Sequence, residues 1–273
     1  MMKSNPGELQ HKARKRFGQN FLEDDGIIQR IVRSIGSGGD DHLVEIGPGK
    51  GAITQWLVES CQRLDVVELD RDLAEWLKQK YQTQDHFHLH QADALKFDFS
   101  ALQQGDKTLR ILGNLPYNIS TPLIFHLLGY HKLISDMHFM LQKEVVHRMA
   151  AAPGEKAYGR LGIMVQYYCR VDTLFLVPPE AFDPQPKVES AIVRLQPYDK
   201  PPFVAKDIKV MERLVNIAFQ MRRKTLRNAL KKMIPVEHIE QLEIDTKRRP
   251  ETLSVQEFVE LSNVLSDIHT ASE

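Results

Sequence analysis

HLVEIGPGKGAITQWLVES, residues 42–60, is the stretch that predicts the fold. It begins with HLVEIG (42–47), a short run rich in β-forming residues that ends in glycine, and it continues into GAITQWLVES (51–60), which is typical of a helix. A strand, a glycine-rich turn and a helix make up the first part of a βαβ unit. The remaining sequence shows whether that unit repeats.

Strands and helices alternate after this stretch. The expected elements are strands at 63–70, 86–93, 110–114 and 137–142, and helices at 71–81, from Thr121-Pro122 onward and at 143–151. Thr121 is expected to cap its helix, with Pro122 in the first helical position. This alternation predicts an α/β fold with a parallel sheet wound on both faces.

The pattern changes from about residue 158. VDTLFLV (171–177) and VESAIVRL (188–195) are two strands without a clear helix between them, so we expect an antiparallel addition at the edge of the sheet. QPYDKPPF (196–203) is rich in proline and turn residues and is a candidate linker. Beyond it the sequence is helical, with a capping box at Ser254 and Glu257. We therefore expect two domains, 1–200 and a small all-α domain at 201–273.

The glycine-rich turn EIGPGKGAIT (45–54) is a candidate ligand site. Gly47 and Gly49 lack side chains, so a ligand can lie against the backbone there. The dinucleotide fingerprint needs a third glycine where this chain has Ala52, and Lys50 is not followed by the rest of a Walker A loop. NAD and nucleoside triphosphates are therefore disfavoured, although a turn of this kind can also be purely structural.

Acidic residues end the next two strands. Glu68 stands where an acid can bind ribose hydroxyls, and Asp93 stands where a carboxylate could accept a hydrogen bond from an adenine amino group. Either residue alone could be a solvated acid at a strand end. Because the carboxyl ends of parallel strands line one crevice, the turn and the two acids together predict a ligand that carries an adenosine.

GNLPYNIS (113–120) closes the fourth strand beside this crevice. Together with the turn, Glu68 and Asp93, its Asn114-Leu115-Pro116-Tyr117 resembles the Asp/Asn-x-Pro-Tyr tetrapeptide of S-adenosylmethionine-dependent N6-adenine methyltransferases. The closer resemblance, over nearly the whole chain, is to the bacterial small-subunit rRNA adenine dimethyltransferase family. Segments that match its signatures, in its order, are RKRFGQNFL (14–22), EIGPGKGAIT, GNLPYNISTPLIFHLL (113–128), QKEVVHRM (142–149), AYGRLG (157–162), FDPQPKVESAIVRL (182–195) and RRKTLRNAL (222–230).

The resemblance carries several expectations. It implies a Rossmann-like class I methyltransferase sheet, S-adenosylmethionine as the cofactor, and a monomer. It also implies N6,N6-dimethylation of two adjacent adenines in the 3′-terminal hairpin loop of 16S rRNA, within a small-subunit precursor. It assigns Asn20 and Leu22 to the cofactor pocket and makes Phe182 a second stacking ring, although a core phenylalanine is the more frequent fate of such a residue. Departures at Lys50, Ile53 and Gly162 do not touch positions assigned to chemistry.

The tetrapeptide also has a physical rationale for this chemistry. The nucleophile is an exocyclic amine whose lone pair is delocalised into the purine ring. Acceptors at the Asn114 side-chain oxygen and the Leu115 carbonyl would favour a pyramidal nitrogen, and Pro116 fixes the backbone that aims them. Tyr117 offers a ring for stacking. Catalysis is then mostly positioning, with no metal and no strong base, whereas the alternative is a simple turn with a buried tyrosine.

Basic residues are clustered, although Lys plus Arg (36) balance Asp plus Glu (36). KARKR (12–16), RRKTLRNALKK (222–232) and KRR (247–249) contain no acidic residue. A charge run is usually a solvated face, but such dense runs on a neutral chain favour contact with RNA phosphates. The candidate RNA-binding residues are Arg14, Lys15, Arg16, Arg222, Arg223, Lys224, Arg227 and Arg248.

The cysteines, the lack of a signal or membrane segment, and the histidines bear on the cellular compartment and on metal binding. The two cysteines, Cys61 and Cys169, do not form a disulfide framework or a zinc site, and neither a signal peptide nor a membrane-length apolar run is evident. HLH (88–90) lacks partners that would make it a metal site. We expect a cytoplasmic protein that needs neither a membrane nor a metal.

Three alternatives remain. The first is the related large-subunit rRNA dimethyltransferase that confers macrolide resistance, against which RRKTLRNAL and FDPQPKVES favour the small-subunit enzyme. The second is a ribosome-assembly factor with an incidental methyltransferase site. The third, an adenine-specific DNA methyltransferase, predicts proline in place of Leu115 and a target-reading domain, and neither is evident.

Overall fold

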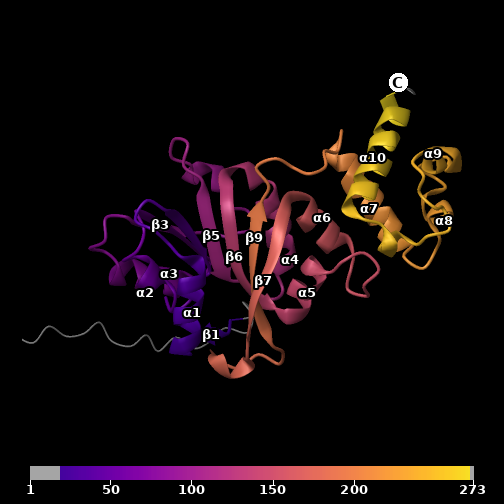
Figure 1. Cartoon of the computed structure of the whole chain (residues 1–273). Coiled ribbons are helices and arrows are strands. Elements are labelled where there is room, and N and C mark those ends of the chain that lie inside the picture. Colours follow the sequence, from indigo (N-terminus) through magenta and orange to yellow (C-terminus); the bar gives the residue numbers. More distant parts are fainter. Residues whose placement is uncertain (1–18, 271–273) are drawn as a thin grey trace, which may run out of the picture. The chain divides into compact units, whose positions relative to one another are not determined.

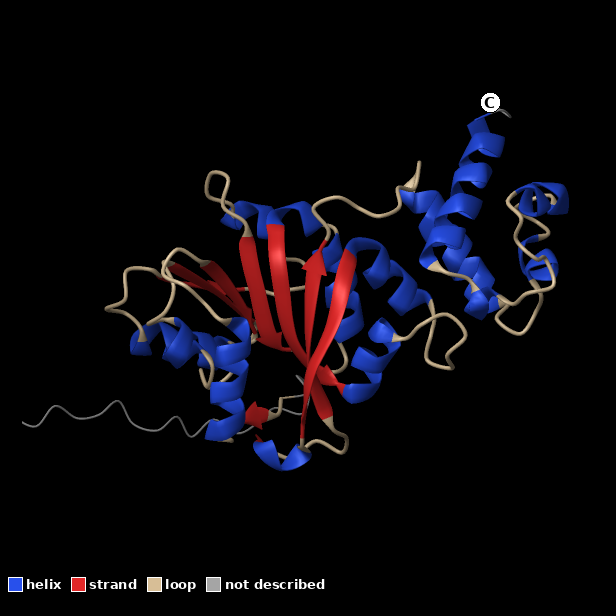
Figure 2. Ribbon diagram, in the orientation of Figure 1, coloured by secondary structure: helices blue, strands red, loops and turns tan. Residues whose placement is uncertain are grey.

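A seven-stranded sheet forms the centre of the fold in the computed structural model, which describes residues 19–270 (Figures 1 and 2). The strand order is β4-β3-β2-β5-β6-β9-β7. The strands are β2 (His42–Ile46), β3 (Arg63–Glu68), β4 (Phe87–Gln91), β5 (Leu109–Asn114), β6 (Ile134–Gln142), β7 (Cys169–Val177) and β9 (Ser190–Pro197). The pairs from β4 through β6 are parallel, and β9 joins β6 antiparallel. The expected α/β fold with an antiparallel edge is confirmed.

The central place of β2 in the sheet agrees with its burial. All five residues of β2 are buried, as expected for a central strand covered on both faces. The connecting helices are α1 (Asp25–Ile35), α2 (Thr54–Leu57), α3 (Arg71–Lys80), α4 (Ser120–Leu128) and α5 (Lys143–Ala150). Asp24 and Asp70 cap α1 and α3 through their side chains.

Two helices differ from expectation. The helix expected at 51–60 is reduced to α2, four residues long, because three glycines precede it and a turn follows it. The helix expected to have Thr121 as its cap and Pro122 in its first position begins two residues earlier, at Ser120, and Ile119 before it provides no side-chain cap. The backbone amides of Ile119 and Ser120 both donate to the Pro116 carbonyl at 3.1 Å, so the tetrapeptide itself starts the helix.

A second, two-stranded sheet joins segments far apart in the sequence. β1 (Phe21–Leu22) pairs antiparallel with β8 (Phe182–Asp183), with Leu22 opposite Phe182. Strands of two residues are too short to show periodicity, so this pairing could not be predicted from a sequence pattern. As a result of the pairing, residues 19–22 lie at the carboxyl edge of the main sheet, where they line a cavity.

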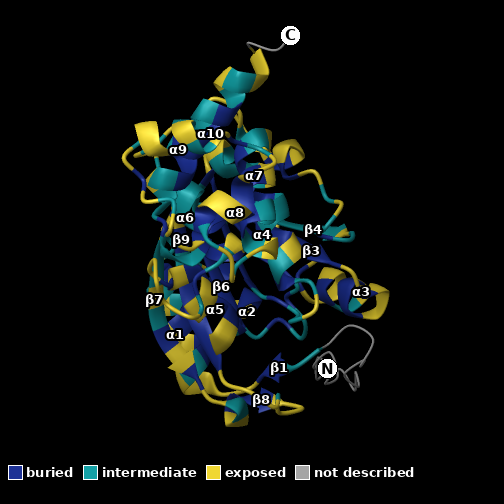
Figure 3. Ribbon diagram, turned by 90° about the vertical axis from the view of Figure 1, so that its right-hand side faces the viewer, coloured by how far each residue is buried: buried dark blue, intermediate teal, exposed yellow. Residues whose placement is uncertain are grey.

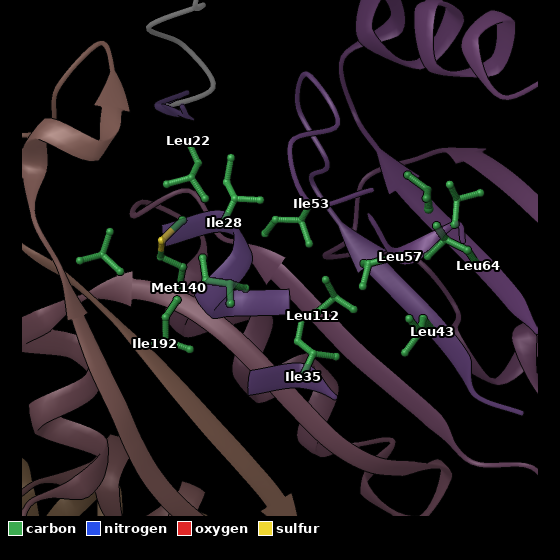
Figure 4. Close-up of a cluster of buried hydrophobic side chains, with 14 of the residues drawn as sticks. Leu22, Ile28, Ile35, Leu43, Ile53, Leu57, Leu64, Leu112, Met140 and Ile192 are labelled. Atoms are coloured by element: carbon green, nitrogen blue, oxygen red, sulfur yellow. The ribbon is translucent and has the colours of Figure 1, made fainter. Parts of the chain in front are cut away.

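A hydrophobic cluster supports that edge from below (Figure 4). It brings together side chains from β1, α1, β2, α2, β5, β6 and β9, which are buried to 6% exposure or less: Leu22, Ile28, Leu43, Ile53, Leu57, Leu112, Met140 and Ile192. Because these side chains are closely packed, the loops above them have a rigid base.

The chain separates into two compact units, 1–146 with 172–197, and 147–171 with 198–273. Residues 147–171, which the sequence analysis put in the first domain, thus group with the C-terminal helices. The helices of this second unit are α6 (Arg160–Tyr168), α7 (Ile208–Gln220), α8 (Leu226–Leu230), α9 (Val236–Gln241) and α10 (Val255–Thr270).

The second unit has its own core. α7 packs against α6, α8 and α10, and the buried Tyr158 hydroxyl donates to the Leu253 carbonyl at 2.8 Å. The capping box before α10 is confirmed, since the Glu257 amide donates to Ser254 Oγ at 3.1 Å and the Ser254 amide to Glu257 Oε2 at 2.7 Å. Along α7 and α10 buried residues recur among partly or fully exposed ones, as in amphipathic helices, whereas residues 161–165 of α6 are all buried (Figure 3).

Candidate active site

A cavity of about 380 Å³ lies at the carboxyl ends of β2, β3, β4 and β5, within the first unit. The strand order brings these ends together although they are distant in the sequence. Every predicted cofactor-binding residue lines the cavity, as do the other three members of the tetrapeptide: Asn20, Leu22, Gly47, Gly49, Glu68, Asp93, Asn114, Leu115, Pro116 and Tyr117.

The glycine-rich turn forms the floor of one side of this cavity. Gly47 and Gly49 have φ of 66° and 58°, in the left-handed region that favours glycine. A Cβ added at Gly49 would lie 3.1 Å from the Phe21 ring. Glycine at this position therefore lets β1 close against the turn and keeps the backbone accessible.

Glu68 sits at the end of β3 with only 6% of its surface exposed. Its carboxylate accepts from the Asp70 amide at 2.7 Å and, more weakly, from the Gly49 amide at 3.4 Å. Burial raises the pKa of Glu68 to about 7, against the lowering effect of these two hydrogen bonds. Burial thus outweighs these hydrogen bonds, and ribose hydroxyls could donate further hydrogen bonds to the carboxylate.

Asp93 and its loop form the wall beyond Glu68. Asp93 Oδ1 accepts from the Leu95 amide at 3.0 Å, which shapes the loop. The side chain is half-buried, and Oδ2 has no hydrogen bond among residues 19–270. One carboxylate oxygen therefore remains for an amino group in the cavity.

Glu45 also lines the cavity, and the sequence analysis gave it no role. It is 2% exposed and accepts from Thr54 Oγ1 at 2.6 Å. Burial raises the pKa of Glu45 to about 7; the Thr54 hydrogen bond lowers it, and the nearby Glu68 raises it further. The signal was present in the sequence, because Glu45 is an acidic residue between the apolar residues Val44 and Ile46, and a buried carboxyl needs a polar partner.

The amide of Asn114 has a fixed orientation. Its Nδ2 donates to the Asn20 backbone carbonyl at 3.1 Å. A carbonyl can only accept, so this contact selects the NH₂ end of the amide. The Asn114 side-chain oxygen is thereby left as an acceptor at the cavity.

The rest of the tetrapeptide is anchored on both sides. The Leu115 amide donates to the Met140 carbonyl at 3.2 Å, whereas no group within residues 19–270 donates to the Leu115 carbonyl. The Tyr117 hydroxyl lies 2.9 Å from Ser190 Oγ. Two acceptors, Asn114 Oδ1 and the Leu115 carbonyl, thus come from adjacent residues beside one aromatic ring.

Phe182 is placed differently from the expectation. It does not line the cavity; it is 4% exposed and belongs to the hydrophobic cluster beneath the edge of the sheet. Its backbone pairs with Leu22, and this pairing turns the ring into the core. In this structure Phe182 is a packing residue, and its position gives no support to the stacking role.

The basic residues divide into two groups. Arg222 forms an ion pair with Glu251 and donates to the Lys156 carbonyl at 2.8 Å, and Arg248 forms an ion pair with Glu257. These two guanidinium groups make contacts within the second unit, and their expected contact with phosphates stays a prediction.

Arg223, Lys224 and Arg227 are exposed and have no ion-pair partner within residues 19–270. They remain candidates for contact with phosphates. Arg14, Lys15 and Arg16 lie outside the described residues.

No group of three or more His, Cys, Asp or Glu side chains within residues 19–270 is arranged to hold a metal ion. No helix in the same range is long and apolar enough to cross a membrane.

Comparison with known proteins identifies relatives along the whole chain. Residues 10–267 match the ribosomal RNA adenine dimethylase family. A protein of Saccharophagus degradans called ribosomal RNA small subunit methyltransferase A is 61% identical over 255 residues, which cover 93% of this chain and 95% of that protein. The protein of the same name from Pseudomonas aeruginosa is 58% identical over 259 residues, covering 95% and 97%.

Solved structures agree on the fold. A dimethyladenosine transferase from Plasmodium falciparum superposes with a TM-score of 0.78 at 26% identity, covering 92% of this chain and 98% of that one. The 23S rRNA methyltransferase ErmE superposes with a TM-score of 0.72 at 22% identity, over 90% and 100%, and shows the shared fold alone. The chain belongs to the ribosomal RNA adenine dimethylase family.

Proposed function

We propose that this protein transfers methyl groups from S-adenosylmethionine to N6 of adenine in small-subunit ribosomal RNA. Support comes from family membership and from relatives at 58–61% identity that are called small-subunit methyltransferases. The large-subunit alternative has less support, since ErmE is 22% identical. In its finer form the proposal is dimethylation of two adjacent adenines in the 3′-terminal hairpin loop of 16S rRNA, by a monomer acting in the cytoplasm on a subunit precursor.

The cavity fits S-adenosylmethionine, which supplies an activated methyl group when it is bound. The left-handed turn at Gly47 and Gly49 leaves backbone exposed for a ligand, Glu68 can accept from ribose hydroxyls, and Asp93 can accept from an adenine amino group. Asn20 and Leu22 close the cavity from β1 and its preceding loop. These residues bind and orient the cofactor.

The observation that carries the proposal is the orientation of Asn114. Because Nδ2 is held by the Asn20 carbonyl, Oδ1 can accept one N–H of a target amine while the Leu115 carbonyl accepts the other. Two such acceptors favour a pyramidal nitrogen with a localised lone pair. They interact most strongly with the transition state, so their contribution appears in the rate of methyl transfer. A target adenine must leave its stack to reach them, and Tyr117 offers a ring to receive it.

Substitution of Asn114 tests the proposal. Asn114→Ala removes one of the two acceptors, so turnover at saturating S-adenosylmethionine should fall by roughly two orders of magnitude or more. Binding to immature subunits should change little, because phosphate contacts dominate that affinity. Incorporation of tritiated methyl groups measures turnover, and co-sedimentation with immature subunits measures binding.

A matched control is Asn263→Ala. Asn263 Nδ2 also donates to a backbone carbonyl, that of Val204 at 3.2 Å, but it lies in the second unit. Its replacement should leave methyl transfer near the wild-type rate. Near-wild-type transfer by Asn114→Ala would overturn the role given to the tetrapeptide. If the wild-type protein itself binds subunits without methylating them, the assembly-factor alternative holds instead.

A further inference from the structure

Ser190 makes a contact with the tetrapeptide that the catalytic proposal does not use. Its Oγ lies 2.9 Å from the Tyr117 hydroxyl, and Ser190 is only 1% exposed. Tyr117 is half-buried and lines the cavity, whereas Ser190 does not line it. The serine therefore touches the tyrosine at the tip of its ring and cannot itself meet a ligand.

The two residues reach each other across the end of one strand. Ser190 is the first residue of β9 and pairs with Gln142, the last residue of β6. The tetrapeptide follows β5 on the other side of β6, and its Leu115 amide donates to Met140 at 3.2 Å. The tetrapeptide is thus held at the Leu115 backbone through β6, and at the Tyr117 hydroxyl through β9.

Holding both ends of a ring restricts its rotation. A tyrosine has two side-chain torsions. The hydroxyl oxygen lies on the axis of the second torsion, so its hydrogen bond fixes the first torsion through the position of that oxygen. It also disfavours rotation about the second torsion, because the phenolic O–H prefers the plane of the ring. A ring already held in its stacking orientation loses little rotational entropy when a base binds, so binding costs less free energy. This matters for an extruded base, which has to find its receiving surface quickly.

We propose that Ser190 is a positioning residue for the target base, which acts by holding the face of the Tyr117 ring toward the cavity. The inference rests on the proposed function, since it assumes that Tyr117 receives an adenine. It assigns a role to the first residue of β9, which the sequence analysis did not single out.

The test is a double-mutant cycle in the full-length protein with immature subunits as substrate. Ser190→Ala and Tyr117→Phe each remove the same hydrogen bond from opposite sides, so each should lower kcat/KM for the subunit by roughly three- to tenfold, the factor expected for one neutral hydrogen bond. The double variant should be no slower than either single variant. Ser190→Thr keeps the hydroxyl and should restore most of the rate.

Two further measurements separate positioning from general damage. S-adenosylmethionine affinity by calorimetry should be unchanged in Ser190→Ala. A hairpin RNA with 2-aminopurine at the target position should be less quenched by Ser190→Ala than by wild type, because stacking on an aromatic ring quenches this base. Ser135→Ala is the matched control, since it removes a hydroxyl that bonds the Leu109 carbonyl at 3.3 Å near the opposite end of β6.

Wild-type kinetics in either single variant would overturn the inference, as would additive losses in the double variant. If Ser190→Ala does not fold, Tyr117→Phe takes its place, because it removes the same hydrogen bond. Its kcat/KM and its quenching of 2-aminopurine then test the inference. Absence of methyl transfer by the wild-type protein would instead overturn the proposed function, so the two failures are distinguishable.

Discussion

Glu68 is a buried carboxyl whose surroundings favour its neutral form. Its pKa is raised to about 7 by burial, while ribose hydroxyls would bind best to the ionised form. Cofactor affinity should therefore rise with pH up to about 7 and level off above it, by at most roughly tenfold per pH unit on the rising side. Calorimetry with S-adenosylmethionine between about pH 6 and about pH 8 measures this.

The matched pair for this experiment is Glu68→Gln and Glu45→Gln. Glu68→Gln should bind more weakly and lose the pH dependence, whereas Glu45→Gln should keep it, because Thr54 rather than the ligand bonds that carboxyl. A flat profile for the wild type would contradict the assignment of Glu68.

The same shift has a consequence for stability. A raised folded pKa means that the neutral carboxyl favours the folded state; this contribution is fully present below the ordinary pKa of about 4.5 and is lost as pH rises through about 7. The free energy of unfolding of the wild type should thus fall across this range by more than that of Glu68→Gln. Urea denaturation at several pH values measures the difference, and parallel curves would contradict it.

The roles of individual residues were predictable where these residues lie at the end of a strand. Glu68, Asp93 and Asn114 each follow or end a strand, so the topology alone brings them to one cavity. Glu45 and Phe182 were not predictable in the same way, because Glu45 lies inside a strand that is buried on both faces rather than at its end, and the position of Phe182 depends on a pairing of two-residue strands.

At the scale of the element, β5 passes unusually close to β2. A Cβ added to Gly113 would overlap the carbonyl oxygen of Ile46 and lie 3.1 Å from the Leu115 side chain. Gly113→Ala should therefore push the two strands apart, lowering the free energy of unfolding by on the order of 1–3 kcal/mol and displacing Asn114. Urea denaturation and methyl transfer measure the two effects.

Gly39→Ala is the control for that substitution. A Cβ there would meet nothing within 4 Å, so stability should change by no more than about 0.5 kcal/mol. Equal stability of Gly113→Ala and the wild type would mean that the strands can adjust without cost.

Elements were predicted best where their periodicity was long. The strands of the main sheet fall close to their expected positions, because buried parallel strands are continuous apolar runs. The start of α4 was misjudged, since the Pro116 carbonyl replaces the side-chain cap that Thr121 was expected to provide. β1 and β8 are too short to give any local signal.

At the scale of the whole molecule, the division into units was harder to predict than the fold. Residues 147–171 precede the last strands in the chain but group with the C-terminal helices. A division at the proline-rich linker assumes that each domain is continuous in sequence. Only three-dimensional contacts, such as the one between Tyr158 and Leu253 at 2.8 Å, reveal that the second unit is assembled from two segments.

The charge distribution of that unit allows a sharp prediction about RNA. Arg223, Lys224 and Arg227 are exposed without an ion-pair partner among residues 19–270, while Arg222 is paired with Glu251. Replacing the three with glutamine should weaken binding to immature subunits and flatten the plot of log affinity against log salt by about one unit per lost contact. Glutamine in place of three exposed lysines of the first unit, Lys78, Lys96 and Lys132, is the matched control and should leave the slope unchanged.

Arg222→Ala should differ from both the triple variant and its control, because the Arg222 guanidinium is already bound by Glu251 and by the Lys156 carbonyl. Removing it leaves a half-buried carboxylate without its partner, so the variant should lose stability, by roughly 1–3 kcal/mol, while the salt slope stays close to that of the wild type. Co-sedimentation at several salt concentrations and urea denaturation separate the two outcomes. A salt slope that falls in Arg222→Ala as it does in the triple variant would show that the ion pair opens to bind phosphate. An unchanged slope in the triple variant would leave this run of basic residues as a solvated face only.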